Sequence, residues 1–246
     1  MKNTYFKRIK NRSILLLCVF LILSSCEVLD EESLTQVSTE KFYQNESDAL
    51  DALTAAYARL KSGNGYYKQV FLSALYASSD QGLSTFLFRD FKTGTITNTN
   101  PNLTPMWRDI YFGIRDANNV IANVGSIDMD EQLKSRIIGE ARFLRGLHYF
   151  NLVRCFGEVP LRTEPIDLDS SESEGLPISS IVDIYEVMIG DLDYASQNCW
   201  GRNEVINNYS NDLGRATKAA AHAMLAKVYL RIASSKRTAL LGVEGN

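Results

Sequence analysis

The sequence contains few of the residues on which nucleic-acid binding or metal chemistry depends. Its formal net charge is −3, from 26 basic and 29 acidic residues among 246, so it indicates no basic surface for a nucleic-acid partner. It has only two histidines, His148 and His222, and neither has a second ligand at metal-binding spacing. We therefore expect both histidines to be buried and hydrogen-bonded within helices, and we expect no metal or other cofactor.

Motifs for catalysis on phosphoryl or acyl groups are also missing. The glycine pair in Gly63-Asn64-Gly65 lacks the Gly-Lys-Ser/Thr ending of a phosphate-binding loop. No serine or cysteine lies in the pattern of a nucleophile elbow. A glycosidase needs two facing carboxylates, and the spacing of the acidic residues does not point to such a pair. The sequence therefore gives no indication of an enzyme.

Cysteines are too few to build a disulfide framework. Of the four, Cys18 and Cys26 lie near the N-terminus, which leaves Cys155 and Cys199 in the body of the chain. Each of these two lies on a predicted apolar helix face. We expect buried free thiols at both positions.

No apolar run near the N-terminus is long enough to cross a bilayer as a helix. Residues 1–25 combine five basic residues with the ten-residue apolar run Ile14–Leu23, which is typical of a secretory leader. Leu23-Ser24-Ser25-Cys26 then resembles a bacterial lipobox, so Cys26 is the expected lipidation site and its acyl chains would give a stable anchor. An ordinary signal peptide with an incidental cysteine is the alternative. Residues 26–38 follow as an acidic tether that resembles the surface-export signal of Bacteroidetes lipoproteins.

Apolar residues recur at helical spacing through most of the remaining chain, so we expect an all-α fold. The helix near 130–156 has apolar residues on two sides, which indicates that it is buried between neighbours. Gly157 and Pro160 should end it. The full set of predicted helices comprises residues 39–61 with Thr39 as N-cap, 70–77, 107–124, 130–156, 181–197 with Ser179 or Ser180 as N-cap, and a last helix from 215 onward.

Polar residues inside these helices predict how the helices contact one another. Glu140 and Arg145 are five residues apart and do not align along the helix, so each should meet a partner elsewhere. Asp191 and Asp193 point to different sides of their helix, so they are not a catalytic pair, and we expect both to be solvated. Asn118, a poor helix former, should satisfy a polar partner at a helix crossing.

The stretch from Asp80 to Pro105 is rich in Gly, Ser, Thr and Asn and shows no clean periodicity. A long polar loop that carries aromatic residues is often functional. Aromatic rings stack on sugar rings, and Asp and Arg bind hydroxyl groups. The candidate ligand-binding residues are Asp80, Phe86, Phe88, Arg89 and Phe91. The alternative is that the phenylalanines pack beneath the loop as a small satellite core.

Four ordered blocks of sequence carry a resemblance to a known family. They are Trp107–Tyr111 with Ala117-Asn118, Gly139–Phe150 with Phe156–Leu161, Ile184-Tyr185 with Asp191-Leu192 and Ala195, and Gly214–Lys218 with Ala226–Leu230. Together with the lipobox, they resemble the SusD/RagB family of outer-membrane nutrient-binding lipoproteins. The resemblance covers nearly the whole chain but only the first half of the family pattern.

The resemblance implies a SusD-like fold of tetratricopeptide-type helix pairs with long irregular loops. Residues 39–246 would form its N-terminal helical domain, which we expect to be truncated. It also implies non-catalytic capture of a glycan or other nutrient by a lipid-anchored protein on the exterior of the outer membrane, and delivery to a SusC-like TonB-dependent transporter.

Two alternative functions stay open. One is a binder of peptides or of another non-sugar nutrient from the same family. The other is a truncated scaffold fragment without a complete ligand site. If the next partner of the last helix is missing, an apolar face of that helix should be exposed.

Overall fold

The computed structural model of the chain describes residues 42–61, 63–82, 86–165, 175–201, 203–204 and 212–240. All of these belong to Glu40–Asn246, one of the two units into which the chain divides, the other being Met1–Thr39. The predicted leader, the lipidation site Cys26, the tether at 26–38 and the predicted cap at Thr39 lie outside the described residues.

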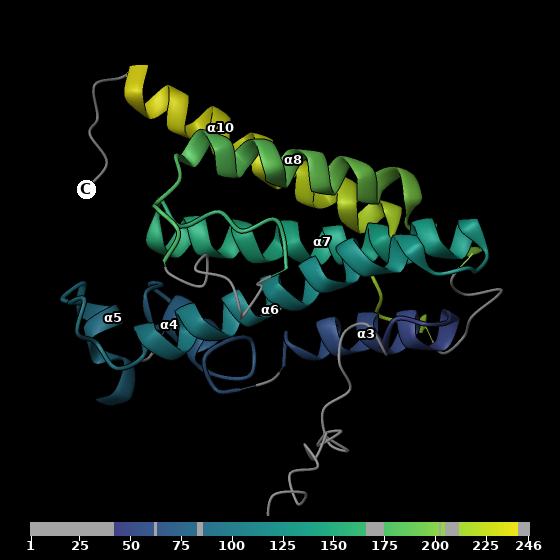
Figure 1. Cartoon of the computed structure of the whole chain (residues 1–246). Helices are drawn as coiled ribbons and strands as arrows, with labels where there is room; N and C mark the ends of the chain where they lie inside the picture. Colours follow the sequence, from purple (N-terminus) through teal and green to yellow (C-terminus); the bar gives the residue numbers. More distant parts are fainter. Residues whose placement is uncertain are drawn as a thin grey trace, which may run out of the picture. The chain divides into compact units, whose positions relative to one another are not determined.

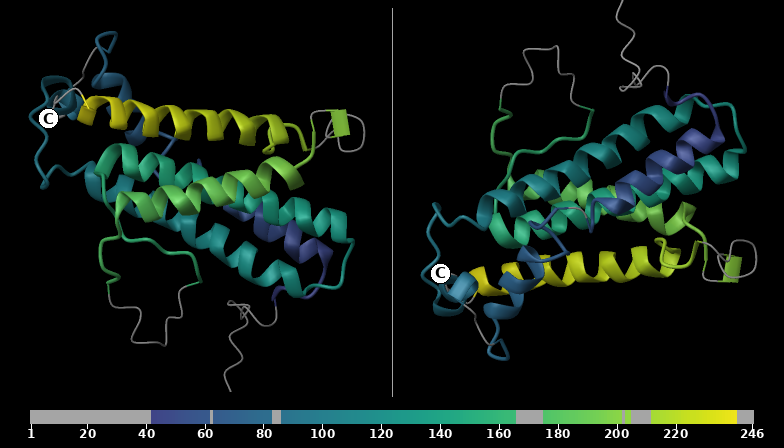
Figure 2. Two further views of the ribbon diagram at one scale, coloured as in Figure 1. Left: turned by 90° about the horizontal axis from the view of Figure 1, so that it is seen from above. Right: turned by 90° about the horizontal axis from the view of Figure 1, so that it is seen from below.

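Long helices packed side by side form the body of the second unit. The longer helices of the described part are α3 (Glu46–Ala58), α6 (Leu103–Asn123), α7 (Glu131–Phe156), α8 (Ile181–Asn198) and α10 (Lys218–Leu240). Helix α7 lies between α6 and α8, with α3 packed on α6 and α7 and with α10 on α8 (Figures 1 and 2). The described residues contain helices and no strand, which confirms the all-α prediction.

Short helices fill the region between α3 and α6. Helix α4 (Val70–Ala77) forms where it was predicted. The expectation of an irregular loop from Asp80 to Pro105 is wrong in its middle, where η1 (Phe86–Phe88) leads into α5 (Arg89–Thr93). Gly94 then ends α5 with φ +69°, a left-handed conformation that glycine adopts without strain.

Side-chain caps set the helix ends. Asn45 and Asp48 form a reciprocal capping box, so α3 begins at Glu46 and the predicted start near residue 39 is too early. Ser180 caps α8, as predicted, because its hydroxyl accepts a hydrogen bond from the Asp183 amide at 3.2 Å. Gly157, at φ +73°, ends α7 as expected.

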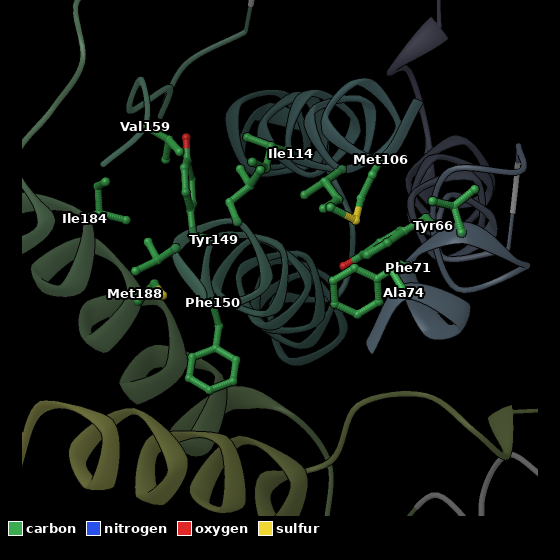
Figure 3. Close-up of a cluster of buried hydrophobic side chains, with 14 of the residues drawn as sticks. Tyr66, Phe71, Ala74, Met106, Ile114, Tyr149, Phe150, Val159, Ile184 and Met188 are labelled. Carbon is green, nitrogen blue, oxygen red and sulfur yellow. The ribbon is translucent and has the colours of Figure 1, made fainter. Parts of the chain in front are cut away.

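Helix α7 buries apolar side chains on two sides, as predicted. Ile137, Ala141 and Leu144 pack with residues of α3 and the end of α6. Tyr149 and Leu152 belong to a second cluster that also draws on α4, α6 and α8. Figure 3 shows this second cluster around α7, with the following side chains from the α4 and α6 side and from the α8 side: Tyr66, Phe71, Ala74, Met106, Ile114, Ile184 and Met188.

A buried ion pair joins α7 to α8. Arg145 donates to both Asp191 carboxylate oxygens, with N–O distances of 2.7 Å each, and the exposed fractions of the two residues are 6% and 2%. Its remaining terminal nitrogen donates to the side-chain oxygen of Asn118 and to the carbonyl of Thr163, both at 2.9 Å. The partners expected for Arg145 and Asn118 are therefore confirmed. The expectation of a solvated Asp191 is wrong because Asp191 shares the inner face of α8 with Met188 and Leu192.

A second buried polar cluster lies one helix turn before the first. Glu140 accepts hydrogen bonds from Arg136 Nε at 2.7 Å and from the Tyr57 hydroxyl at 2.8 Å. Arg136 also donates to Asp212 at 2.7 Å, which fastens the segment before α10 to α7. Burial raises the pKa of the Glu140 carboxyl, and the nearby Arg136 charge acts in the opposite direction. Glu140 thus has one partner on its own helix, Arg136, and one on α3, Tyr57, so the expected partner elsewhere in the fold is confirmed.

Helix α10 begins at Lys218, slightly later than predicted, and is covered on one side only. Ala221 and Val228 are fully buried, whereas Tyr229 and Leu230 are 54% and 70% exposed. The exposed apolar face considered from the sequence is therefore present. Within the described part of the chain, no helix is both long enough and apolar enough to span a membrane.

Candidate ligand-binding site

The candidate site is built by η1, α5 and the turn that leads into α6. Two phenylalanines fix this region to the body, since Phe88 and Phe91 are each only 8% exposed and their ring centroids are 6.1 Å apart. Both rings belong to the cluster that contains Val70 and Ala74 of α4. The burial of these two rings holds the polar residues of α5 at the surface.

A hollow of about 550 Å³ lies between α5 and the start of α6. Six of its eight lining residues have polar side chains, although apolar atoms make up more of the lining surface than polar atoms do, and Leu87 adds an apolar side chain that is 64% exposed. The residues that line it are Leu87, Arg89, Asp90, Thr93, Thr95, Asn100, Pro101 and Asn102.

Asn100 holds the wall of this hollow together. It is only 7% exposed, and its side-chain nitrogen donates to Asp90 Oδ2 at 3.0 Å. Its side-chain oxygen accepts from the Asn102 amide at 3.0 Å, and the Asn102 side chain donates to the carbonyl of Leu87 at 3.1 Å. These bonds link η1, α5 and the first turn of α6, so the hollow has a fixed frame.

The hollow offers groups that suit hydroxyl-rich ligands. Arg89 is exposed and forms no ion pair with another described residue, so its guanidinium is available as a donor. The hydroxyls of Thr93 and Thr95 lie 2.8 Å apart, and Asp90 adds carboxylate acceptors. Together with the apolar surface of Leu87, this combination matches the alternating polar and apolar character of a sugar ring.

The structure brings together only part of the predicted site. Arg89 lines the hollow, and Phe86 begins η1. Phe88 and Phe91 are buried in the core cluster, as in the satellite-core alternative, so little of either ring is open to a ligand. Asp80 is exposed and does not line the hollow. A ligand role for the five residues stays a prediction.

Sequence reasoning missed most of the residues that line the hollow. Asn100 and Asn102 lie within the polar run that was read only as a loop, and Asp90 and Thr93 lie in a helix that was not predicted. One available signal was Asn100-Pro101-Asn102 directly before a helix, because asparagine commonly bonds backbone groups at helix starts.

Other titratable groups are buried away from the hollow, in the body of the described part. His148 is fully buried, its Nδ1 lies 3.1 Å from the Tyr66 hydroxyl, and burial lowers its pKa to about 3. His222 is exposed on α10, so the prediction of a buried histidine is confirmed at position 148 and wrong at position 222. Cys199 is a buried free thiol whose pKa is raised by burial to about 12, and Cys155 is free and half-buried.

The described residues contain no cluster of three potential metal ligands among histidine, cysteine, aspartate and glutamate. The hollow between α5 and the start of α6, with its ordered frame, is the candidate site within the described part of the chain.

Comparisons with known proteins match most of this chain. The pattern of a SusD-like family, described as starch-binding and associating with the outer membrane, matches residues 27–230. SusD-like protein P2 of Formosa agariphila is 28% identical over 226 residues, which cover 90% of this chain and 43% of that protein. A solved SusD-like protein described as laminarin-binding is 31% identical, with a TM-score of 0.65 over 80% of this chain and 42% of that one.

A solved SusD homologue from Bacteroides thetaiotaomicron is 29% identical, with a TM-score of 0.65 over 81% of this chain and 38% of that one. This chain therefore spans less than half the length of the relatives that it matches.

Proposed function

Because this chain belongs to the SusD/RagB family, we propose that it is a cell-surface lipoprotein that binds a glycan and delivers it to a SusC-like TonB-dependent transporter. The family match over residues 27–230 carries this proposal. Binding of this kind is non-covalent and needs no catalytic group or cofactor. Transport would be driven by the transporter, and this protein would supply recognition.

The hollow at α5 supports glycan binding by this chain. Its volume of about 550 Å³ lies within the usual range of small-ligand sites, roughly 300–1,000 Å³. Arg89, Asp90 and Thr93 offer charged and hydroxyl groups, and Leu87 offers an apolar contact. Asn100 keeps these groups in place without a ligand, which lowers the entropic cost of binding.

Isothermal titration calorimetry with the full chain in detergent tests this site. The ligands are malto- and laminari-oligosaccharides, with mixed-sequence peptides as the comparison. We expect an oligosaccharide to bind, and Arg89→Gln to weaken binding about three- to tenfold through loss of a charge-assisted hydrogen bond. Arg231→Gln, which removes an exposed arginine on α10, is the matched control and should bind normally.

Other outcomes of this experiment would support the two alternatives. Peptide binding without oligosaccharide binding would favour a non-sugar nutrient binder. Binding of neither class would favour a scaffold without a ligand site. An oligosaccharide that binds equally to the wild type and to the Arg89→Gln variant would place the site outside the hollow.

Lipidation at Cys26 would supply the proposed anchor, and the acidic tether at 26–38 would direct the protein to the exterior of the outer membrane. The intact mass of the protein from the outer-membrane fraction should include three acyl chains. Cys26→Ser should remove that added mass and release the protein from the membrane fraction. Co-purification of the transporter with the lipidated protein tests the proposed partner, and repeated failure to recover any such transporter would refute it.

A further inference from the structure

A group of three arginines surrounds one phenylalanine on the surface shared by α3 and α6. The guanidinium carbons of Arg59, Arg108 and Arg115 lie 5.6, 6.0 and 5.0 Å from the centre of the Phe112 ring. The Phe112 side chain is 37% exposed. We call these four residues the arginine cluster. Arg59 follows α3, whereas the other three residues lie on α6, which packs against α3 (Figure 2).

Two inward-facing carboxylates hold the arginines in place. Arg115 donates to Asp116 Oδ1 through two nitrogens at 2.9 and 2.8 Å, and Arg59 donates to Oδ2 of the same residue. Arg108 donates to Asp109 Oδ1 at 2.9 Å. Asp109 Oδ2 accepts a hydrogen bond from the Gly65 amide at 2.8 Å. Each of these four carboxylate oxygens therefore has a donor.

The cluster presents guanidinium groups at the surface. The Asp109 and Asp116 side chains are largely buried, whereas those of Arg108 and Arg115 are 53% and 37% exposed. An arginine has five N–H donors, and the bonds to Asp109 use only part of those of Arg108. Because the guanidinium groups lie around the Phe112 ring, the ring orients cations and is poorly placed to stack on a sugar. The chemistry that fits is an oxyanion.

The arginine cluster lies further along α6 from the turn that lines the hollow. Thr104, Arg108 and Phe112 are spaced four residues apart and are all exposed, so they form a stripe on one face of the helix. Asn102 of the hollow lies directly before this helix. At about 1.5 Å per residue, Arg108 is roughly 9 Å and Phe112 roughly 15 Å along the axis from Asn102. That separation is within reach of a short oligosaccharide.

We propose that the arginine cluster binds an anionic substituent, a sulfate ester or a carboxylate, on the glycan held at the hollow. This inference rests on the proposed glycan-binding function and specifies its ligand class as an acidic glycan. The hollow binds hydroxyl groups of the glycan, and the arginine cluster selects glycans that carry negative charge.

Calorimetry with paired ligands tests the inference. The full chain in detergent is titrated with malto- and laminari-oligosaccharides in native, chemically sulfated and carboxymethylated forms. We expect at least one charged form to bind about two- to fivefold more tightly than its neutral parent for each guanidinium engaged. The preference should disappear at high salt, where the screening length falls to roughly 3 Å at 1 M.

Single-residue variants distinguish the contribution of the arginine cluster to binding from that of the hollow. Arg108→Gln should remove most of the preference for charged ligands and leave neutral binding unchanged. Arg108→Lys should keep part of the preference, and Arg231→Gln should keep all of it. Arg89→Gln should weaken neutral and charged ligands alike. Circular dichroism confirms that each variant is folded, which is needed above all for Arg108→Gln because it removes the positive charge beside the largely buried Asp109.

The experiment distinguishes a failure of this inference from a failure of the proposed glycan-binding function. Neutral binding that depends on Arg89, without any preference for charged forms, would overturn this inference and leave the proposed function standing. Absence of binding by every oligosaccharide would overturn both. Arg108-dependent binding to vesicles of phosphatidylglycerol and phosphatidylcholine, without tighter binding of charged glycans, would overturn the inference in favour of a membrane contact.

Discussion

Removal of one carboxylate charge at Asp191 should destabilise the fold strongly. Asp191 is 2% exposed and makes two 2.7 Å hydrogen bonds to Arg145, which is itself buried. In Asp191→Asn, one oxygen can still accept a hydrogen bond, but the amide nitrogen would face a guanidinium nitrogen. The arginine charge would then be buried without a counter-charge, which typically costs about 3–5 kcal/mol. We expect a loss near 3 kcal/mol, because Asn118 and Thr163 still bind Arg145.

Asp193→Asn is the matched control for this prediction. Asp193 lies two residues along the same helix, is exposed, and accepts a hydrogen bond from Gln197 at 2.8 Å. Such an i, i+4 contact on a helix surface contributes only about 0.2–0.5 kcal/mol. Urea unfolding of the full chain in nonionic detergent, followed by circular dichroism, should give a lower midpoint for the first variant and a nearly unchanged midpoint for the second.

A double variant tests the cause of the loss. Replacing a whole buried ion pair with apolar residues is often neutral or stabilising, whereas removing one partner is not. Arg145→Met with Asp191→Leu should therefore recover part of the stability lost in Asp191→Asn. If Asp191→Asn and Asp193→Asn unfold at the same urea concentration, then the carboxylate at 191 is solvated and the reasoning is refuted.

Three further predictions concern stability and solubility. Burial lowers the pKa of His148 to about 3, so between about pH 6.5 and 3 only the unfolded chain binds a proton at this residue. The free energy of unfolding should therefore decrease by roughly 1.4 kcal/mol for each pH unit by which the pH is lowered in that window. In urea unfolding at several pH values, a His148→Gln variant should lose this slope and His222→Gln should retain it. Gly113→Ala should lower the melting temperature, at a cost of about 1–3 kcal/mol, because its Cβ would lie 2.4 Å from the His148 ring, whereas Gly190→Ala, at an exposed open position in α8, should raise it. Leu230→Lys should reduce aggregation in light scattering, because Leu230 is 70% exposed beside Tyr229; unchanged aggregation would exclude this face as its cause.

The long helices were predictable because each repeats its pattern over several turns. Helix α7 has 26 residues, enough to show apolar positions on two sides and to indicate that it lies between neighbours. Its end was clear from the sequence because Gly157 can take the positive φ that ends a helix, as it does in the structure, and because Pro160 follows. The start of α3 was placed too early because aromatic residues at 42 and 43 continue the apolar pattern, whereas the Asn45 capping box sets the actual start.

The hollow could not be predicted because its elements are too short. Helix α5 has five residues and η1 has three, which is too few to display a period. Phe88 and Phe91 are three residues apart, a spacing that fits one buried turn as well as an exposed aromatic pair. Only the contact of that turn with α4, which the sequence does not show, establishes that the two rings are buried. The arginine cluster was missed because Arg59 lies 49 residues before Arg108, and sequence spacing does not show that α3 and α6 are adjacent.

The charges of α7 follow from the backbone groups that this helix must satisfy. Arg145 and Asn118 donate to the carbonyls of residues 162–164, and the Tyr149 hydroxyl accepts from the Arg162 amide at 2.6 Å. Arg136 fastens the segment before α10 through the side-chain carboxylate of Asp212. A purely apolar α7 would pack against its neighbours, but the Thr163 carbonyl would lose its donor Arg145 and the Arg162 carbonyl its donor Tyr149, whereas Asn118 of α6 would still bind this segment. A typical hydrogen bond contributes about 0.5–1.5 kcal/mol, so the buried arginines of α7 hold the segments at 162–164 and before α10 in addition to pairing with the helices beside them.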